Sequence, residues 1–253
     1  MEQQREKIVN ALVKLYEPSD DVYAVWENGS TAFNRVDDYS DIDLAVECET
    51  NAIPSLIEKA EKILEEVVGI EYRYEMKQNF FQGMTQIFYK FKNTSPFLLL
   101  DIGFLHHGET KDNLTQPEIH GDVKVHFDKI GMTENKELEK GEWDKKMAER
   151  IAAHRERFQV FDILPLKELY RKQYVDTFAF YMGHYINPLV ELLRIKYKPF
   201  RYNFGLRYLS YDLPEEEFKL IEQLVFVKDG TDMEKKAMIA KKKIQELLDE
   251  LSQ

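Results

Sequence analysis

The spacing of hydrophobic residues divides the chain into two parts with different expected structure. In the first part, runs rich in β-branched and aromatic residues predict strands over residues 22–26, 41–46, 70–76, 85–91, 97–104 and 123–127. Apolar residues three to four positions apart predict amphipathic helices over 5–16 and 54–68. After residue 131 the strand pattern ends, and helical periodicity follows over 140–163, 166–196, 214–227 and 233–251. Strands first and helices second predict an α+β domain at residues 1–130 and an all-α helical domain at 131–253.

Charge is unevenly distributed between these two parts. The 253 residues carry a net charge of -11, and the first 130 hold 24 acidic and 13 basic side chains, so the second part is neutral. A chain without excess positive charge lacks the electrostatic attraction that nonspecific nucleic-acid binding needs. An acidic first part favours divalent cations and cationic small molecules instead.

Cysteine content and hydropathy narrow the class of protein further. The single cysteine, Cys48, excludes an internal disulfide and a cysteine-based zinc site. No apolar run reaches the roughly 18–20 residues of a membrane span, and the N-terminus lacks the apolar core of a signal peptide. We therefore expect a cytoplasmic protein without a membrane partner.

Two aspartates open the second predicted strand. Asp41 and Asp43 flank Ile42, and because side chains alternate along a strand, both project from one face while Ile42 enters the core. Two carboxylates a few ångströms apart repel each other unless a cation lies between them. Mg²⁺, which prefers oxygen ligands, would relieve that repulsion. The pair therefore indicates a metal site, although Asp-x-Asp alone is also common at solvated strand ends.

A third aspartate and a Gly-Ser turn complete the pattern. Asp101 lies inside an apolar run, where an ionised carboxylate is costly without a partner, so we infer that it faces the same ion. Gly29-Ser30 follows the first predicted strand and can offer backbone N–H groups and a hydroxyl to a phosphate. Three carboxylates beside a phosphate-binding turn predict chemistry on a metal-bound nucleoside triphosphate.

These segments resemble the nucleotidyltransferase superfamily of the DNA polymerase β type. The family pattern is Gly-Ser, a short spacer, two acidic residues separated by one hydrophobic residue, and a third acidic residue on a later strand. The layout is most similar to that of bacterial aminoglycoside (streptomycin-type) adenylyltransferases and their uncharacterised relatives, which segments 123–129 and 207–210 also resemble. The resemblance covers about residues 20–130 and implies a mixed β-sheet with flanking helices, followed by a helical domain.

The resemblance also implies a reaction and a set of roles. Asp41 and Asp43 would bind two Mg²⁺ ions, and Asp101 would either ligate one of them or act as the general base. Gly29 and Ser30 would hold the β- and γ-phosphates of ATP or another nucleoside triphosphate. The expected reaction moves a nucleoside monophosphate, AMP when ATP is the donor, to a hydroxyl of a small-molecule acceptor such as an aminoglycoside-like compound.

Further phosphate contacts are expected from basic residues elsewhere in the chain. Arg35, in the loop before Asp41, is one candidate. Glu191, on a predicted helix, could supply a base from the helical domain. The other candidates belong to a basic cluster among aromatic residues around Pro199: Lys196, Lys198, Arg201 and Arg207. Of these four we select Lys198 as the phosphate contact. A solvated basic loop is the alternative for each of these four.

Two other functions are compatible with the same residues. The first is transfer of a nucleotide to a protein or RNA partner, although a neutral second part gives RNA little to bind. The second is a nucleotide-binding protein without turnover, which the complete set of three aspartates disfavours.

Overall fold

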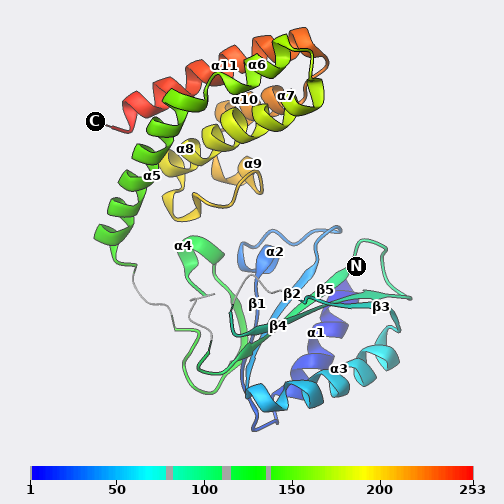
Figure 1. Cartoon of the computed structure of the whole chain (residues 1–253). Coiled ribbons are helices and arrows are strands. Elements are labelled where there is room, and N and C mark those ends of the chain that lie inside the picture. The colour runs from blue at the N-terminus through cyan, green and yellow to red at the C-terminus, as the bar shows by residue number, and fades with distance from the viewer. Residues whose placement is uncertain (1, 78–81, 110–114, 135–137, 253) are drawn as a thin grey trace. The chain divides into compact units, whose positions relative to one another are not determined.

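The chain folds into two compact units, each with its own hydrophobic core. The computed structural model describes residues 2–77, 82–109, 115–134 and 138–252. A sheet unit spans Met1–Lys136 and a helical unit spans Glu137–Gln253, both drawn in Figure 1. The sequence predicts domains at 1–130 and 131–253, so the first unit continues a little further than expected.

A turn held by one carboxylate extends the sheet unit past residue 130. Asp128 accepts the backbone N–H groups of Gly131 and Thr133 at 2.9 and 2.8 Å, and the Thr133 hydroxyl donates to it at 2.6 Å. Burial raises the pKa of Asp128, but these hydrogen bonds lower it overall. The turn lets Met132 pack against a small cluster that includes Trp26.

The described part of the first unit contains a six-stranded mixed sheet in the order β3-β4-β5-β2-β1-β6. Only the central pair, β2 and β5, is parallel, and every other neighbouring pair is antiparallel. The strands lie where the hydrophobic pattern predicts them: β1 (Val22–Glu27), β2 (Ile42–Cys48), β3 (Ile70–Glu75), β4 (Met84–Phe91), β5 (Leu99–His106) and β6 (Lys124–Asp128). The expected α+β class with a mixed sheet is confirmed.

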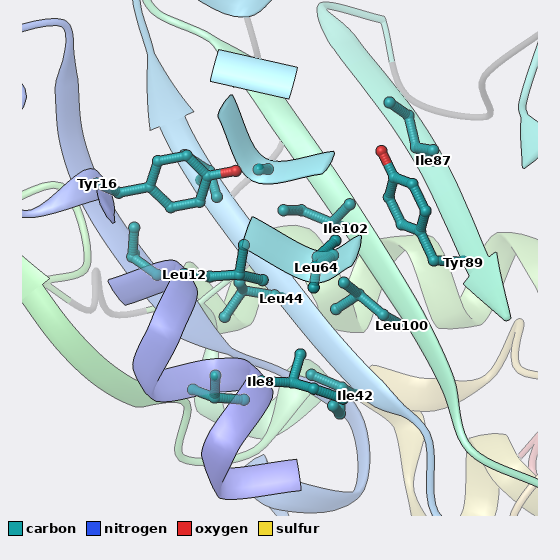
Figure 2. Packing of buried hydrophobic residues seen from close by; sticks show 14 of the residues in the cluster. Ile8, Leu12, Tyr16, Ile42, Leu44, Leu64, Ile87, Tyr89, Leu100 and Ile102 are labelled. Atoms are coloured by element: carbon teal, nitrogen blue, oxygen red, sulfur yellow. The ribbon is translucent and has the colours of Figure 1, made fainter. Parts of the chain in front are cut away.

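Two helices cover one face of this sheet. These are α1 (Glu2–Tyr16) and α3 (Ile53–Val67), preceded by a 3₁₀ turn at Thr50–Ala52; the shorter α2 (Gly29–Ala32) and α4 (Pro117–His120) follow β1 and β5. Figure 2 shows apolar side chains of α1 and α3 packed on alternate residues of the strands, among them Ile42, Leu44 and Ile102. Because successive residues of a strand face opposite ways, Asp43 and Asp101 lie on the other face.

The helical unit contains α5 (Lys140–Phe161), α6 (Leu164–Tyr170), α7 (Tyr174–Tyr181), a π-helical turn (Met182–Ile186), α8 (Asn187–Tyr197), a 3₁₀ turn (Pro199–Arg201), α9 (Leu209–Asp212), α10 (Glu215–Val225) and α11 (Gly230–Glu250). The single helical stretch predicted over 166–196 is divided. Lys172 adopts a left-handed conformation with φ of 61°, which ends α6, because its N–H turns back to the carbonyl of Leu169 at 2.9 Å. None of the described helices is both long and apolar enough to cross a membrane.

Candidate metal and nucleotide site

The three aspartates named by the sequence motif lie at one end of the central parallel strands. Asp43 on β2 is paired in register with Asp101 on β5, and neighbouring strands lie about 4.8 Å apart. Asp41 comes one residue before β2, and its Oδ1 accepts the backbone N–H of Leu99 at 3.3 Å. The parallel pairing thus joins positions 58 residues apart in sequence.

Burial and mutual repulsion perturb these carboxyl groups. Burial raises the pKa of Asp101, hydrogen bonds from Gln86 lower it, and the charges of Asp43 and Asp41 raise it further, to about 6 in total. The Gln86 amide donates to both oxygens of Asp101, at 2.8 and 2.9 Å, and so orients that carboxylate. Burial also raises the pKa of Asp41. A cation among these groups would replace repulsion by attraction.

Asp101→Asn is expected to stabilise the metal-free protein at neutral pH. Because the folded-state pKa, about 6, exceeds the ordinary value of 3.8, ionisation of Asp101 costs stability as pH rises from about 4 to 6. At 1.36 kcal/mol per pKa unit, the variant should be more stable by about 2–3 kcal/mol at pH 7.5 and by much less near pH 4. Urea unfolding with EDTA measures the difference at each pH. The exposed Asp122→Asn serves as control, and a gain that does not change with pH would contradict this account.

The Gly-Ser turn lies directly against Asp43. Gly29 has a φ of 58°, in the left-handed region, and a Cβ built on it would lie 1.8 Å from Oδ2 of Asp43. The backbone N–H of Asn28 donates to the Asp43 carbonyl at 2.8 Å, which fixes the start of the turn to β2. Only glycine allows both the backbone conformation and this close approach. The structure therefore brings together the two halves of the motif.

The Ser30 hydroxyl is buried and lacks a hydrogen-bond partner among the described residues. Buried polar atoms are nearly always paired in native proteins, so such a hydroxyl is available to a ligand. The carbonyl of Ser30 accepts the backbone N–H of Arg35 at 2.9 Å, and the Arg35 guanidinium lies 4.9 Å from the centroid of the Phe33 ring. Arg35 therefore follows the turn closely, and its phosphate contact stays a prediction.

A buried arginine that the sequence analysis did not select supports both halves of the site. Arg5 on α1 is 5% exposed, and its guanidinium donates to the carbonyls of Ser40, at 3.2 Å, and Asp41. It also donates to the Thr31 hydroxyl at 3.1 Å and to Glu27 at 3.4 Å. One side chain thus contacts the residues that enter β2 and the residue that follows Gly29-Ser30.

Glu27 is the buried counter-charge of that arginine. Its carboxylate lies 3.1 Å from the Lys124 ammonium and 3.0 Å from Nε2 of His126, and it accepts the Thr31 hydroxyl at 3.2 Å. Burial raises the pKa of Glu27, but the contacts with His126 and Lys124 outweigh it and lower the pKa to about 2. The sequence held a signal for this network, because Arg5 lies in helical phase with Ile8, on the apolar stripe of its helix.

Arg5→Met is expected to destabilise the sheet unit by about 3 kcal/mol, because it removes one partner of a buried ion pair and several hydrogen bonds at once. Urea unfolding measures the change. Lys14→Met alters an exposed basic residue on the same helix and should change stability by less than about 0.5 kcal/mol. Equal effects of the two substitutions would show that the buried network does not hold the site.

Basic candidates from the helical unit have different environments. Lys198 is exposed at the C-terminal end of α8, and its contact with a phosphate stays a prediction. Arg201 is only 3% exposed and pairs with Asp212 at 2.7 Å, and Lys196 pairs with Glu250 at 2.8 Å. The expectation of a solvent-facing basic group at Arg201 is therefore wrong, because Asp212 and the Phe204 ring, 4.5 Å from its guanidinium, bury it.

Glu191 belongs to an ion-pair network of the helical unit. Arg150 donates to its two oxygens at 2.6 and 2.9 Å, and Nε2 of His154 lies 3.1 Å away. Burial raises the pKa of Glu191, but His154 and Arg150 lower it overall, which makes this carboxylate a weak base. Its geometry favours a structural role within the helical unit.

The donor set of the sheet unit fits a hard divalent cation. Carboxylate oxygens from three aspartates are the ligands that Mg²⁺ prefers. Burial raises the pKa of Asp101, and the charges of Asp43 and Asp41 add to that rise. Among the described residues, no group of three or more His, Cys, Asp or Glu side chains has an arrangement that could hold a metal ion.

Among the comparisons with known proteins, only the one with solved structures found similar chains. No protein-family model matches the chain, and neither does any curated protein. An aminoglycoside 6-adenyltransferase from Bacillus subtilis aligns over 98% of this chain and 90% of its own, with 11% identity and a TM-score of 0.37. A nucleotidyltransferase-like protein from Exiguobacterium sibiricum aligns over 97% and 74%, with 12% identity and a TM-score of 0.37. At that TM-score neither likeness says what this chain does.

Proposed function

We propose that this protein is a metal-dependent nucleotidyltransferase that moves a nucleoside monophosphate, AMP when ATP is the donor, to a hydroxyl of a small-molecule acceptor. The observation that carries the proposal is the contact between the two halves of the motif. Gly29 leaves no room for a side chain beside the Asp43 carboxylate, and Asp43 is paired with Asp101. A phosphate-binding turn and a set of carboxylates are thus neighbours, as a metal-bound triphosphate requires.

Each residue has a role that follows from its position. Asp41 and Asp43 would hold two Mg²⁺ ions, with Asp101 as a further ligand or as the base that accepts the proton of the acceptor hydroxyl. The ions supply charge neutralisation at the attacking and leaving oxygens. Gly29 and the Ser30 hydroxyl bind the β- and γ-phosphates, and Arg35 and Lys198 are further candidates for phosphate contacts. Gln86 orients Asp101 through its amide.

The reaction that these groups support is an in-line displacement at the α-phosphorus. A bond forms between the acceptor oxygen and the α-phosphorus, the bond to the bridging oxygen of the β-phosphate breaks, and pyrophosphate leaves. The proton of the acceptor hydroxyl passes to Asp101 or to water. Positioning and electrostatic stabilisation carry such a reaction, because the protein forms no covalent intermediate.

Incubation with ATP labelled at the α-phosphate, Mg²⁺ and a panel of hydroxylated small molecules, including aminoglycosides, tests the proposal. We expect label on an acceptor, release of one pyrophosphate per transfer, and loss of both with EDTA. Asp41→Asn is the matched variant and should lose the transfer. Asp41 is only partly buried and lies outside the hydrophobic core, so its substitution leaves the core intact.

Two results would contradict transfer to a small molecule, and a third would contradict the assignment of the site. Label on a co-purified protein or RNA would show a macromolecular acceptor. Mg²⁺-dependent binding of an ATP analogue with no pyrophosphate release for any acceptor would show a nucleotide-binding protein without turnover. Undiminished transfer by Asp41→Asn would place the chemistry elsewhere.

A further inference from the structure

The described sheet ends at β3 in an exposed strand. β3 is an edge strand whose neighbour in that sheet is β4 (Figure 1). Five of its six residues are exposed, among them Tyr72 at 68% and Tyr74 at 51%. An edge strand presents backbone N–H and C=O groups with which another strand can pair. The groups and charges that β3 presents therefore decide which kind of strand fits it.

The odd-numbered residues of β3 turn their backbone groups to the open edge. The Met76 N–H donates to the carbonyl of Gln86 at 3.0 Å. In an antiparallel pair, positions that exchange hydrogen bonds alternate with positions whose groups point away. Tyr74, two residues earlier in the same register, therefore also bonds to β4. Arg73 and Glu75 lie at the alternate positions, so their N–H and C=O groups face outward.

A bulge limits the stretch of β3 that can pair. Ile70 is opposite Phe91 and Tyr72 is opposite Lys90, so β3 has one residue more than β4 at this point, Glu71. A bulge interrupts regular pairing and bends the edge. A regular ladder on the outer edge is thus available from Tyr72 onward.

Charge alternates along the outward positions, over Glu71, Arg73 and Glu75. A strand that pairs antiparallel with a copy of itself has a two-fold axis at one residue. An axis at Arg73 or at Glu75 places that residue opposite itself, and like charges directly opposite each other are destabilising. An axis at Tyr72 requires the bulged Glu71 to pair. An axis at Tyr74 places Arg73 opposite Glu75 twice and uses only the regular part of the strand.

We propose that β3 pairs antiparallel with β3 of a second copy of this chain, about a two-fold axis at Tyr74, and so joins two molecules into a reversible homodimer. Arg73 of each copy exchanges two backbone hydrogen bonds with Glu75 of the other. Their side chains share the face that α3 covers, where Arg73 also lies 2.6 Å from Glu61. The two Tyr74 rings meet on the opposite face, each beside its own Phe88, and the two sheets become continuous.

The pairing is small, so the dimer is weak. A single strand pair buries less area than a standard interface, and we expect a dissociation constant on the order of 10–100 µM. Within one chain Arg73 pairs with Glu75 at 2.7 Å, so the dimer extends this ion pair into an alternating network of four groups.

Sedimentation velocity on the full chain, over about 5–500 µM, measures the equilibrium between monomer and dimer. The measurement needs neither nucleotide nor metal, so its outcome does not depend on the proposed function. A monomer at every concentration would overturn the proposal and leave the edge of β3 to a strand of another protein.

Charge reversal tests the register of the pairing. Glu75→Arg and Arg73→Glu each put like charges opposite one another twice, so each variant alone should dimerise at least about tenfold more weakly than the wild type. An equimolar mixture of the two variants restores opposite charges at both pairs and should dimerise again. Glu17→Arg makes the same change of charge at an exposed position after α1 and should leave the dimer unchanged. Wild-type dimerisation by Glu75→Arg alone would overturn the proposal.

A disulfide across the axis gives a second test, which leaves Arg73 and its contact with Glu61 intact. At the axis the Cβ atoms lie about 4.5–5.5 Å apart, which a small adjustment brings within reach of a disulfide. Tyr74→Cys, oxidised with copper phenanthroline, should therefore form a covalent dimer. Tyr72→Cys lies about 13 Å from its copy in this register and should not. The buried Cys48 does not compete. Equal cross-linking of the two variants, or cross-linking of Tyr72→Cys alone, would overturn the proposed pairing.

Discussion

Asp43→Asn is expected to abolish nucleotidyl transfer, with a loss of about a thousandfold or more. Asp43 lies against the Gly29 turn and is in register with Asp101, so its carboxylate stands where the two halves of the site meet. An amide keeps the shape and removes the charge that would hold both metal ions. Metal ions contribute several kcal/mol to charge stabilisation in such reactions, and each 1.36 kcal/mol is a factor of ten in rate.

Two measurements check this expectation. Binding of Mn²⁺, followed by electron paramagnetic resonance, needs no acceptor and should weaken by at least about tenfold. Release of pyrophosphate from ATP with the acceptor found in the transfer assay should fall to the background rate. Asp38→Asn makes the same chemical change at an exposed loop position and should alter neither. Retained Mn²⁺ affinity in Asp43→Asn would contradict the assignment of the metal site.

Gly29→Ala is expected to remove metal binding and transfer at a modest cost in stability. The new methyl group would lie 1.8 Å from Oδ2 of Asp43, and the carboxylate is the part that can move. Its rotation resolves the clash but takes the metal ligand away from Asp101. We expect Mn²⁺ affinity to fall at least about tenfold, which is the lower end of the range of losses when a metal site is disturbed. The loss of transfer should be larger.

Gly205→Ala is the matched control for this substitution. Gly205 has the same φ of 58°, and a Cβ on it would meet nothing within 4 Å. Both alanines carry the left-handed backbone cost of about 1–2 kcal/mol, so urea unfolding should give similar losses of stability. Mn²⁺ binding should differ between them. Equal Mn²⁺ affinities would show that the close approach of Gly29 to Asp43 does not position the ligand.

The sequence alone predicts much of the sheet unit because its signals are local. Alternation around Ile42 and Leu44 places these side chains in the core and Asp43 on the opposite face, as the structure has them. The strands and the two long helices follow from the same periodicity. The prediction is weaker for the helical unit, where a continuous apolar period over 166–196 conceals the break at Lys172, which one backbone conformation decides.

The network around Arg5 shows the limit of local signals. Its place on the apolar stripe of α1 can be seen in the sequence, but its acceptors come from residues 27, 31, 40 and 41, which only folding brings together. Arg201 shows the reverse error. A basic residue in a basic and aromatic segment suggests exposure, but in the folded chain Arg201 pairs with Asp212 and is buried. A charge pattern does not tell which charges pair.

The sequence by itself determined the types of residue that the chemistry needs: three aspartates, a Gly-Ser turn and their order along the chain. Composition also determined an acidic first part and a neutral second part. Only the tertiary structure decided that Gly29 lies against the Asp43 carboxylate and that Asp101 is in register with Asp43. The physical reason is that spacing along a strand sets the face of a residue, whereas the pairing of distant strands sets its neighbours.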